Sequence, residues 1–156
     1  MAAPVLLGDP DEIRDLAGKQ RLDLDGITLV DPTVQDERFE QLADALFRRR
    51  QRKGMILRDA REALEDPNMY GAMLVQQGLA DAMLGGVTQY YPDIIRPALQ
   101  AIPLEPDRTV VSAAYVVLLG GRSWFLADCA VNLHPTAEQL AEIALATAAL
   151  ARDMDT

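Results

Sequence analysis

The chain has 156 residues, of which 49% are hydrophobic and 25% charged, a composition typical of a globular protein. This length is enough for one domain with its own core or for part of a larger unit. The formal net charge of −9 argues against nucleic acid or an anionic membrane as the main partner, because both favour a basic surface. No apolar run is long enough to span a bilayer and no signal peptide is recognisable, so we expect a cytoplasmic protein.

Cysteine and histidine each occur once, which limits the chemistry open to the chain. Cys129 can form no internal disulfide, and with His134 it cannot supply the ligands of a conventional zinc site. No glycine-rich nucleotide fingerprint or P-loop occurs, and no serine is placed to act as a nucleophile. We therefore expect no metal and no permanently bound cofactor.

The first part of the chain alternates strand and helix patterns. Apolar runs at Pro4–Leu7 and Ile27–Val30 predict two strands. Asp9 and Pro10 between them predict the start of a helix, with Asp9 as its N-cap. This βαβ order indicates a parallel sheet with a right-handed crossover.

A long helix is predicted over Arg38–Lys53, with apolar residues at helical spacing. It ends in the basic run RRRQRK, which Gly54 follows. At about 100° per residue, Arg50 returns to the core-facing side of the helix while its neighbours fan away. An inward guanidinium needs a partner. The cluster is therefore either a solvated helix end that complements the helix dipole or an anion site that contains Arg50.

After a shorter helical pattern at Leu57–Leu64, the stretch Asp66–Gln100 predicts helix, strand, glycine turn and helix. Asp66 is placed to cap the first helix, and Gly78 to end it. The apolar run Asp81–Leu84 is typical of a buried parallel strand, and it stops at Gly85-Gly86. In open α/β sheets ligands bind at the carboxyl ends of strands, so we expect the ligand site after this run.

An arginine follows this glycine turn. Pro97 disfavours helical dihedrals at Arg96, so the segment Tyr90–Pro97 is predicted to be a partly rigid turn. An arginine at the end of a strand suits a phosphate, which it can hold with two parallel hydrogen bonds. Tyr91 and its neighbour could flank a planar ring, although loop tyrosines more often pack against the protein. The residues alone thus predict an anion site that uses Arg50 and Arg96.

The last third departs from the βαβ order. Val110–Leu119 and Ser123–Val131 are β-rich runs joined by Gly120-Gly121-Arg122, which predicts an antiparallel hairpin. The sheet changes direction here, or a partner subunit packs here. Thr136 and Gln139 then form a capping box at the start of the last helix.

Two stretches of the chain closely resemble the phosphate acetyltransferase family, which also covers phosphate butyryltransferases: MYGAMLVQQGLADAMLGGVTQYYPDIIRPALQ and DCAVNLHPTAEQLAEIA. Their Tyr-Pro-x-x-x-Arg-Pro-Ala-Leu-Gln form resembles the version fused to the C-terminus of bacterial malic enzymes. The resemblance implies an α/β fold of three layers, with a mostly parallel sheet and an antiparallel hairpin, similar to part of the isocitrate/isopropylmalate dehydrogenase-like fold. It also implies a homodimer and the exchange of acetyl-CoA and phosphate for acetyl phosphate and CoA.

The same resemblance implies where the substrates bind. RRRQRKG is similar to the family's basic helix end, and RPALQ carries a second arginine, so both arginines are expected to contact phosphates of CoA or of an acyl phosphate. The residues that we expect to bind CoA or phosphate are Arg50, Arg96, Gly85, Gly86, Thr88 and Tyr91. No catalytic residue is assigned. The expected partners are acetyl-CoA, phosphate or acetyl phosphate, with CoA as substrate or effector.

The chain also departs from the family. A strand and helix before PVLLGDP and roughly half of the family's length after the last helix are absent, so residues 1–156 are expected to form a partial domain. The missing half completes the cleft, and we therefore expect incomplete catalysis by this chain. Ile56 stands where the family commonly has a threonine. Two other functions stay open: an acetyl-CoA-sensing regulatory and oligomerisation domain of a malic enzyme, and a dimerising scaffold without a ligand.

Overall fold

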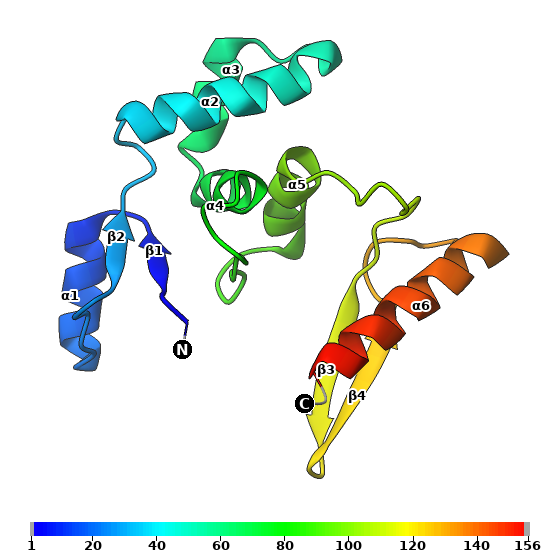
Figure 1. Cartoon of the computed structure of the whole chain (residues 1–156). Coiled ribbons are helices and arrows are strands. Elements are labelled where there is room, and N and C mark those ends of the chain that lie inside the picture. The colour runs from blue at the N-terminus through cyan, green and yellow to red at the C-terminus, as the bar shows by residue number, and fades with distance from the viewer. Residues whose placement is uncertain (1, 155–156) are drawn as a thin grey trace. The chain divides into compact units, whose positions relative to one another are not determined.

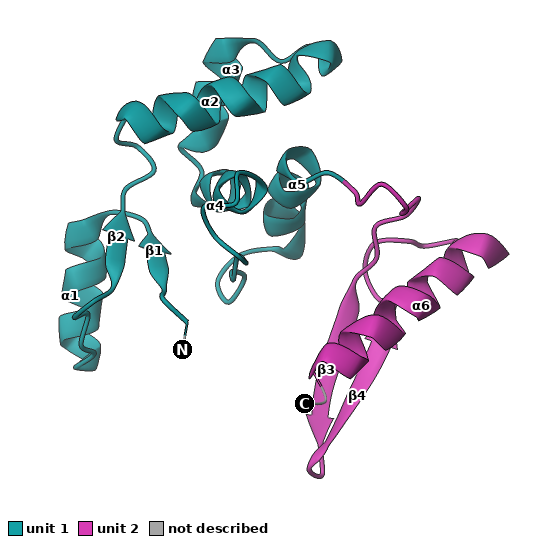
Figure 2. Cartoon of the chain, in the orientation of Figure 1, with its two compact units in different colours: residues 1–103 teal, residues 104–156 magenta. Residues whose placement is uncertain are grey.

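The structure is a computed structural model that describes residues 2–154, and the chain divides into two compact units, with the boundary between residues 103 and 104 (Figures 1 and 2). The first unit contains, in chain order, β1 (Val5–Leu7), α1 (Pro10–Gln20), β2 (Thr28–Val30), α2 (Glu37–Arg50), the 3-10 turn η1 (Gln51–Lys53), α3 (Leu57–Leu64), α4 (Pro67–Gln76) and α5 (Tyr91–Ala101). The second contains β3 (Ala114–Leu119), β4 (Arg122–Ala127) and α6 (Ala137–Met154). No helix in this described part is long and apolar enough to cross a membrane.

The predicted βαβ unit is confirmed. β1 and β2 pair in parallel, with Val5 opposite Thr28, and α1 connects them. Asp9 caps α1 because its side chain accepts hydrogen bonds from the backbone N–H groups of Asp11 and Glu12, at 2.7 and 3.2 Å. With the hairpin of the second unit, the described residues form a mixed α/β fold, in which one strand pair is parallel and one antiparallel.

α3 and α4 also begin where the sequence predicts. The Asp66 carboxylate accepts the backbone N–H of Asn68 at 3.0 Å, and Gly78, with a φ of 69°, follows the end of α4. α3 begins after Ile56, whose side chain cannot accept a hydrogen bond. The Asp59 carboxylate instead accepts the backbone N–H of Ile56 at 3.3 Å, so half of a capping box is formed.

The core of the first unit lies where α2, α3 and α4 pack together. On α2 the buried residues recur on one side of the helix, as the apolar stripe predicts. Fully burying a Leu or Phe side chain contributes about 1.5–3 kcal/mol, so a small cluster suffices to hold three helices. The largest side chains that are fully buried in these helices are Tyr70, Phe39, Leu42, Leu46, Leu64 and Met73.

The predicted strand over Asp81–Leu84 is wrong, because this segment forms no strand. Its Met83 packs on α4, where a Cβ added at Gly71 would lie 3.0 Å from Met83 Sδ and 3.2 Å from Leu7 Cδ1. Leu84 is fully exposed. An apolar run becomes a strand only where a neighbour completes its ladder, and no backbone N–H in this segment finds an acceptor within the described residues.

The predicted turn over Tyr90–Pro97 is also wrong. α5 runs through this segment, with Pro92 in its first turn, where the fixed φ of proline favours a helix. Pro97 inside the helix removes one intrahelical hydrogen bond. Pro97 and Ala101 are both buried, and their packing outweighs the bias that proline imposes on Arg96.

The second unit contains the predicted hairpin and final helix. β3 and β4 pair antiparallel, and the turn glycines Gly120 and Gly121 have φ values of 59° and 74°. The capping box of α6 is formed in both directions. The Gln139 backbone N–H donates to Thr136 Oγ1 at 3.3 Å, and the Thr136 N–H donates to Gln139 Oε1 at 2.8 Å.

One face of this hairpin is apolar and open. Tyr115 lies opposite Leu126 and Val117 opposite Trp124, so the four side chains share a face. They are between 42% and 55% exposed. Phe125, on the other face, is half-buried. Strands that are apolar on both faces are typical of a sheet that is covered on both sides.

The loop after β4 is organised around the carboxylate of Asp128. It accepts hydrogen bonds from the backbone N–H groups of Ala113, Ala130, Val131 and Asn132 and from the side-chain amide of Asn132. Partial burial opposes the charged form, but these bonds outweigh it and lower the pKa of Asp128 to about 2. The ionised carboxylate therefore stabilises this loop.

We expect Asp128→Asn to destabilise the chain at neutral pH and to have little effect in strong acid. A carboxylate whose folded-state pKa is lowered stabilises the fold above its ordinary value of 3.8, and this contribution is lost as the pH falls toward 2. At neutral pH the substitution should lower the free energy of unfolding by about 1 kcal/mol, after allowance for solvent screening. Urea unfolding across this pH range measures it, with Asp107→Asn in an exposed loop as the control. An effect that does not change with pH would contradict the assignment.

Candidate functional site

An open groove of about 350 Å³ lies in the first unit, where α3, the start of α4 and α5 meet. Apolar and polar side chains line it together, and Arg96 is the one predicted site residue among them. The described residues contain no group of three or more His, Cys, Asp or Glu that could hold a metal ion. The residues lining the groove are Ala63, Asp66, Met69, Asp93, Arg96, Pro97 and Gln100.

Arg96 is exposed in this groove, and no residue of the described chain bonds to its guanidinium. Asp93 and Gln100 are three residues before it and four after it on α5, so the three side chains share one side of the helix. A free guanidinium presents five N–H donors in a planar fork that fits a phosphate or carboxylate. Arg96 is therefore available to an anionic ligand.

The groove carries mixed charge, because Asp66 and Asp93 line it beside Arg96. Asp66 caps α4, and Asp93 lies in the first turn of α5, so both carboxylates also stabilise helix N-termini. A purely anionic ligand would meet two like charges here. The lining instead suits a ligand that combines an anionic group with hydrogen-bond donors.

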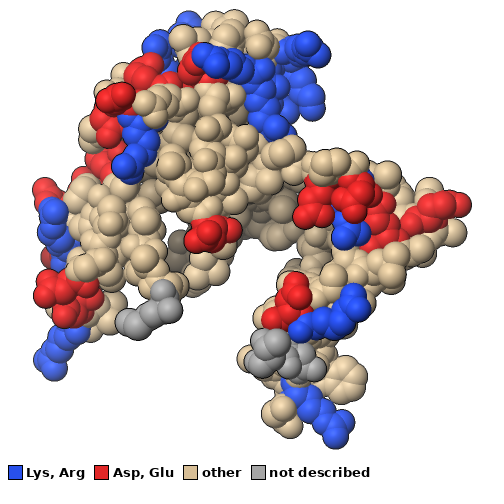
Figure 3. Space-filling view, viewed as in Figure 1, with Lys and Arg blue, Asp and Glu red and all other residues tan. Residues whose placement is uncertain are grey.

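Basic side chains gather over the end of α2, as Figure 3 shows. Arg50 is half-buried there, whereas Arg48 and Arg49 are exposed, as the helical phase predicts. Arg48 pairs with Asp44. No hydrogen bond or ion pair engages the Arg50 guanidinium within residues 2–154, and Arg50 does not line the groove. The groove thus contains one of the two predicted arginines.

Arg49 links α2 to α5, and the sequence analysis missed it. Its Nε donates to the backbone oxygen of Gln100 at 3.2 Å, at the end of α5 where carbonyls lack helical partners. Gln100 itself lines the groove. Because Arg49 lies on the exposed side of its own helix, only knowledge of which helices pack together could have identified this contact.

The glycine turn packs on a different face of α5. Gly86 has a φ of 116°, and a Cβ added there would lie 3.0 Å from Ile94 Cδ1. Gly85 also lies beside Ile94, with a Cβ position 4.0 Å from Cδ1. Ile94 and Arg96 are two residues apart, or about 200° around the helix. The turn and the Arg96 guanidinium therefore do not meet on one face.

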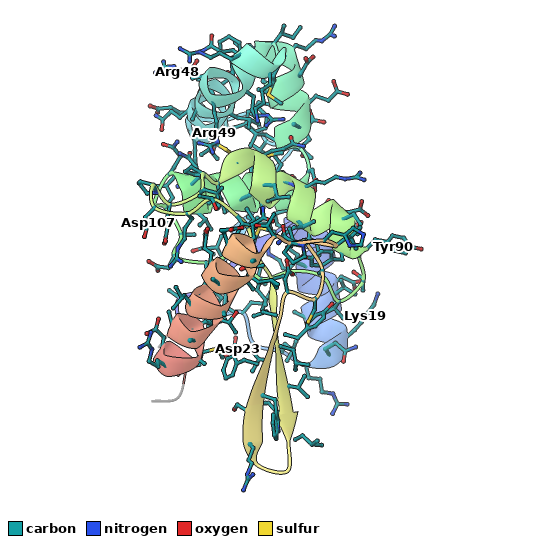
Figure 4. All side chains as sticks on the ribbon, turned by 90° about the vertical axis from the view of Figure 1, so that its right-hand side faces the viewer. Lys19, Asp23, Arg48, Arg49, Tyr90 and Asp107 are labelled. Carbon is teal, nitrogen blue, oxygen red and sulfur yellow. The ribbon has the colours of Figure 1, made fainter. Side chains whose placement is uncertain are left out.

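The remaining predicted residues lie between the glycine turn and α5. Thr88 and Tyr91 are exposed, and neither lines the groove. Tyr90 precedes α5, and its 83% exposed side chain points outward (Figure 4). The predicted site is thus divided among the groove, the glycine turn and the end of α2.

Asn68 was also missed by the sequence analysis. It is the one buried polar residue in the described chain, with 7% exposure. Its Oδ1 lies 3.7 Å from the position that a Cβ on Gly85 would take. The sequence did contain a signal for its burial. Asn68 lies four positions before Ala72 and so on the same side of α4, within the apolar pattern of that helix.

Gly86→Ala should distort the glycine turn, whereas Gly85→Ala should not. Alanine at a positive φ is strained, and its Cβ would lie 3.0 Å from Ile94 Cδ1, which would have to shift slightly, so we expect the free energy of unfolding to fall by about 1–2 kcal/mol. A Cβ at Gly85 would make only ordinary contacts, the nearest at 3.7 Å. Urea unfolding of both variants measures the difference. Equal stabilities would show that Gly86 is not constrained as described.

The comparisons with known proteins agree with one another. Residues 1–156 match the family model described as phosphate acetyl/butaryl transferase. The chain is 39% identical over 143 residues to the phosphate acetyltransferase of Corynebacterium glutamicum, which covers 92% of this chain and 43% of that protein. It is 40% identical over 149 residues to the phosphate acetyltransferase of Escherichia coli, covering 95% of this chain and 20% of that protein.

The solved structures show the same similarity. A phosphotransacetylase from Streptococcus pyogenes superposes with a TM-score of 0.88 at 35% identity, over 99% of this chain and 47% of that chain. The chain therefore spans from a fifth to just under half of the length of these relatives.

Proposed function

This chain belongs to the phosphate acetyl/butaryl transferase family, and we propose that it binds CoA and a phosphate or acyl phosphate for the reaction of acetyl-CoA and phosphate to acetyl phosphate and CoA. The observation that carries the proposal is the free guanidinium of Arg96 in the groove of the first unit. The names of the relatives support the reaction class. A homologous fold supports a similar arrangement of substrates.

CoA has the chemical groups that the groove requires. Its phosphates would accept two parallel hydrogen bonds from Arg96. Its adenine amino group and pantetheine amides are donors that Asp66 and Asp93 could accept, and its apolar atoms could pack against Met69 and Pro97. The mixed charge of the groove thus favours CoA over a bare phosphate.

In one direction of the reaction, the thiolate of CoA attacks the carbonyl carbon of acetyl phosphate. The carbon–sulfur bond forms, the carbon–oxygen bond to phosphate breaks, and phosphate leaves with its electron pair. This transfer needs no protein nucleophile, so positioning and electrostatic stabilisation would be the main contributions of the chain. The half-buried Arg50 is proposed as a second phosphate contact, because no described residue satisfies it.

Residues 1–156 are proposed to be a partial domain of this family. The matched relatives contain at least about twice as much chain, and a cleft needs two walls. Binding of CoA is accordingly the activity proposed for the chain itself. A complete catalytic cycle is proposed for an assembly that also supplies the family's remaining segments.

Arg96→Ala should weaken CoA binding about 10- to 100-fold, because one charge-assisted contact is lost. Isothermal titration calorimetry with CoA measures the affinity. Arg14→Ala removes the same charge from an exposed position on α1 and serves as the matched control. An equal loss of CoA affinity in both variants would show a general effect of net charge and would contradict the assigned contact.

A parallel assay of CoA-dependent phosphate release from acetyl phosphate separates the candidate functions. Turnover that is lost in Arg96→Ala supports an acyltransferase. Binding of acetyl-CoA without turnover supports the alternative function, a sensor fused to a malic enzyme, since a sensor needs binding but no chemistry. No binding at sub-millimolar CoA would reject both and leave a scaffold.

The open face of the hairpin supports a homodimer as a further part of this proposal. Tyr115, Val117, Trp124 and Leu126 present one apolar surface, and a second copy could cover it. A partner subunit packed on this face would add a layer to the sheet. This agrees with the three-layer, isocitrate/isopropylmalate dehydrogenase-like arrangement that the family resemblance implies.

Val117→Lys should then produce a monomer, because it places a charge at the centre of the buried surface. Sedimentation velocity of the wild type and the variant measures the change. Leu145→Lys on α6, where the native side chain is 69% exposed, is the matched control and should remain dimeric. A wild type that sediments as a monomer at all concentrations would refute the dimer.

A further inference from the structure

The last turn of α5 is held to the first unit by few side chains. Pro97 has no N–H and cannot donate to the carbonyl of Asp93, so the helix lacks a hydrogen bond just before this turn. Pro97 and Ala101 are the buried residues of α5, whereas Leu99 between them is 45% exposed. A helix of 11 residues is marginal without tertiary contacts. The position of this turn therefore depends on the contacts at its end.

Arg49 of α2 supplies one such contact. The last carbonyls of a helix have no partner within it, and that of Gln100 accepts the Arg49 Nε–H at 3.2 Å. The cation also complements the negative end of the α5 dipole. The other N–H groups of the Arg49 guanidinium form no bond within residues 2–154. Arg49 is thus linked to α5 by a single hydrogen bond to its backbone.

The turn that Arg49 holds also forms one side of the groove. Pro97 and Gln100 line the groove from this turn, and Arg96 immediately precedes it. The rest of the lining comes from α3 and from the start of α4, so a shift of the turn would move Arg96 relative to that wall. A bidentate arginine contact is sensitive to such a shift, because both of its hydrogen bonds need good geometry. Arg49 itself is exposed and does not line the groove.

We infer that Arg49 is a positioning residue of the groove. Through the Gln100 carbonyl, its Nε–H fixes the last turn of α5 and so holds Arg96 in place for an anionic ligand. The inference rests on the proposed function, which places CoA in the groove. It gives one member of the basic end of α2 a role that requires no contact with the ligand.

Arg49→Gln and Arg49→Met form a matched pair that tests this role. Both remove the positive charge, and both leave an unbranched chain of carbon or sulfur atoms up to the δ position. In Arg49→Gln the amide nitrogen stands as many bonds from the backbone as Nε does in arginine, so it can donate the same hydrogen bond. In Arg49→Met a methyl group stands there. The two variants therefore differ in the donor and have the same charge.

Calorimetry of the full chain with CoA measures the effect of the donor. Arg49→Met should weaken CoA binding about 5- to 10-fold, because the hydrogen bond that holds the turn is lost. Arg49→Gln should bind CoA within about twofold of the wild type, since the lost charge is exposed and screened. Both variants should fold, because the side chain is exposed. Equal CoA affinities in the two variants, lowered or not, overturn the inference.

A double-mutant cycle shows whether Arg49 acts through Arg96. In an Arg96→Ala background the difference in CoA affinity between Arg49→Gln and Arg49→Met should disappear, because the side chain that Arg49 positions is gone. A purely structural role would lower CoA affinity equally in both backgrounds. A difference that persists in the Arg96→Ala background overturns the inference.

Hydrogen exchange without ligand separates the inference from the proposed function. The Ile102 N–H donates to the Ala98 carbonyl at 2.8 Å at the end of α5, and it should exchange faster in Arg49→Met than in Arg49→Gln. The amide of Met73 in the core should exchange equally in both. Equal exchange at Ile102, with CoA binding still dependent on Arg96, overturns the inference and leaves the proposed function standing. Faster exchange in a chain that binds no CoA supports the link and refutes the proposed function.

Discussion

The packing of α4 is the constraint on which the first unit depends. Every residue from Asn68 to Leu74 is buried, and a helix segment that is buried on all sides must sit at the centre of its neighbours. Gly71 lets Leu7 of β1 and Met83 approach the helix backbone closely. The same helix directs Met69 into the groove and Asn68 toward the glycine turn. The position of the groove and of the glycine turn therefore follows from the packing of α4.

The predicted site residues lie on separate surfaces of this unit, with Arg96 in the groove, the glycine turn against Ile94 and Arg50 at the end of α2. CoA is long and carries phosphates, amides and a ring, whereas acetyl phosphate is compact. The proposed function places CoA in the groove of mixed charge. Transfer requires the thiol of one to reach the carbonyl of the other, so their binding sites need to be adjacent rather than identical.

Local signals in the sequence predicted most of the elements correctly. Asp9, Asp66 and Thr136 cap the helices that they were expected to cap, because capping depends on a few neighbouring residues. The errors arose where distant contacts decide. Asp81–Leu84 has no ladder neighbour among residues 2–154, and Pro97 is held in a helix by burial. Arg96 could be selected from sequence, but the contact of Arg49 with Gln100 depends on helix packing that no local pattern contains.

A two-dimensional ¹H–¹⁵N NMR titration of the full chain with CoA tests the central claim most directly. The account predicts saturable shifts that are largest in α5 around Arg96 and Gln100 and at the start of α4 near Asp66. Saturable shifts confined to the hairpin and α6, or no shifts at millimolar CoA, would contradict it.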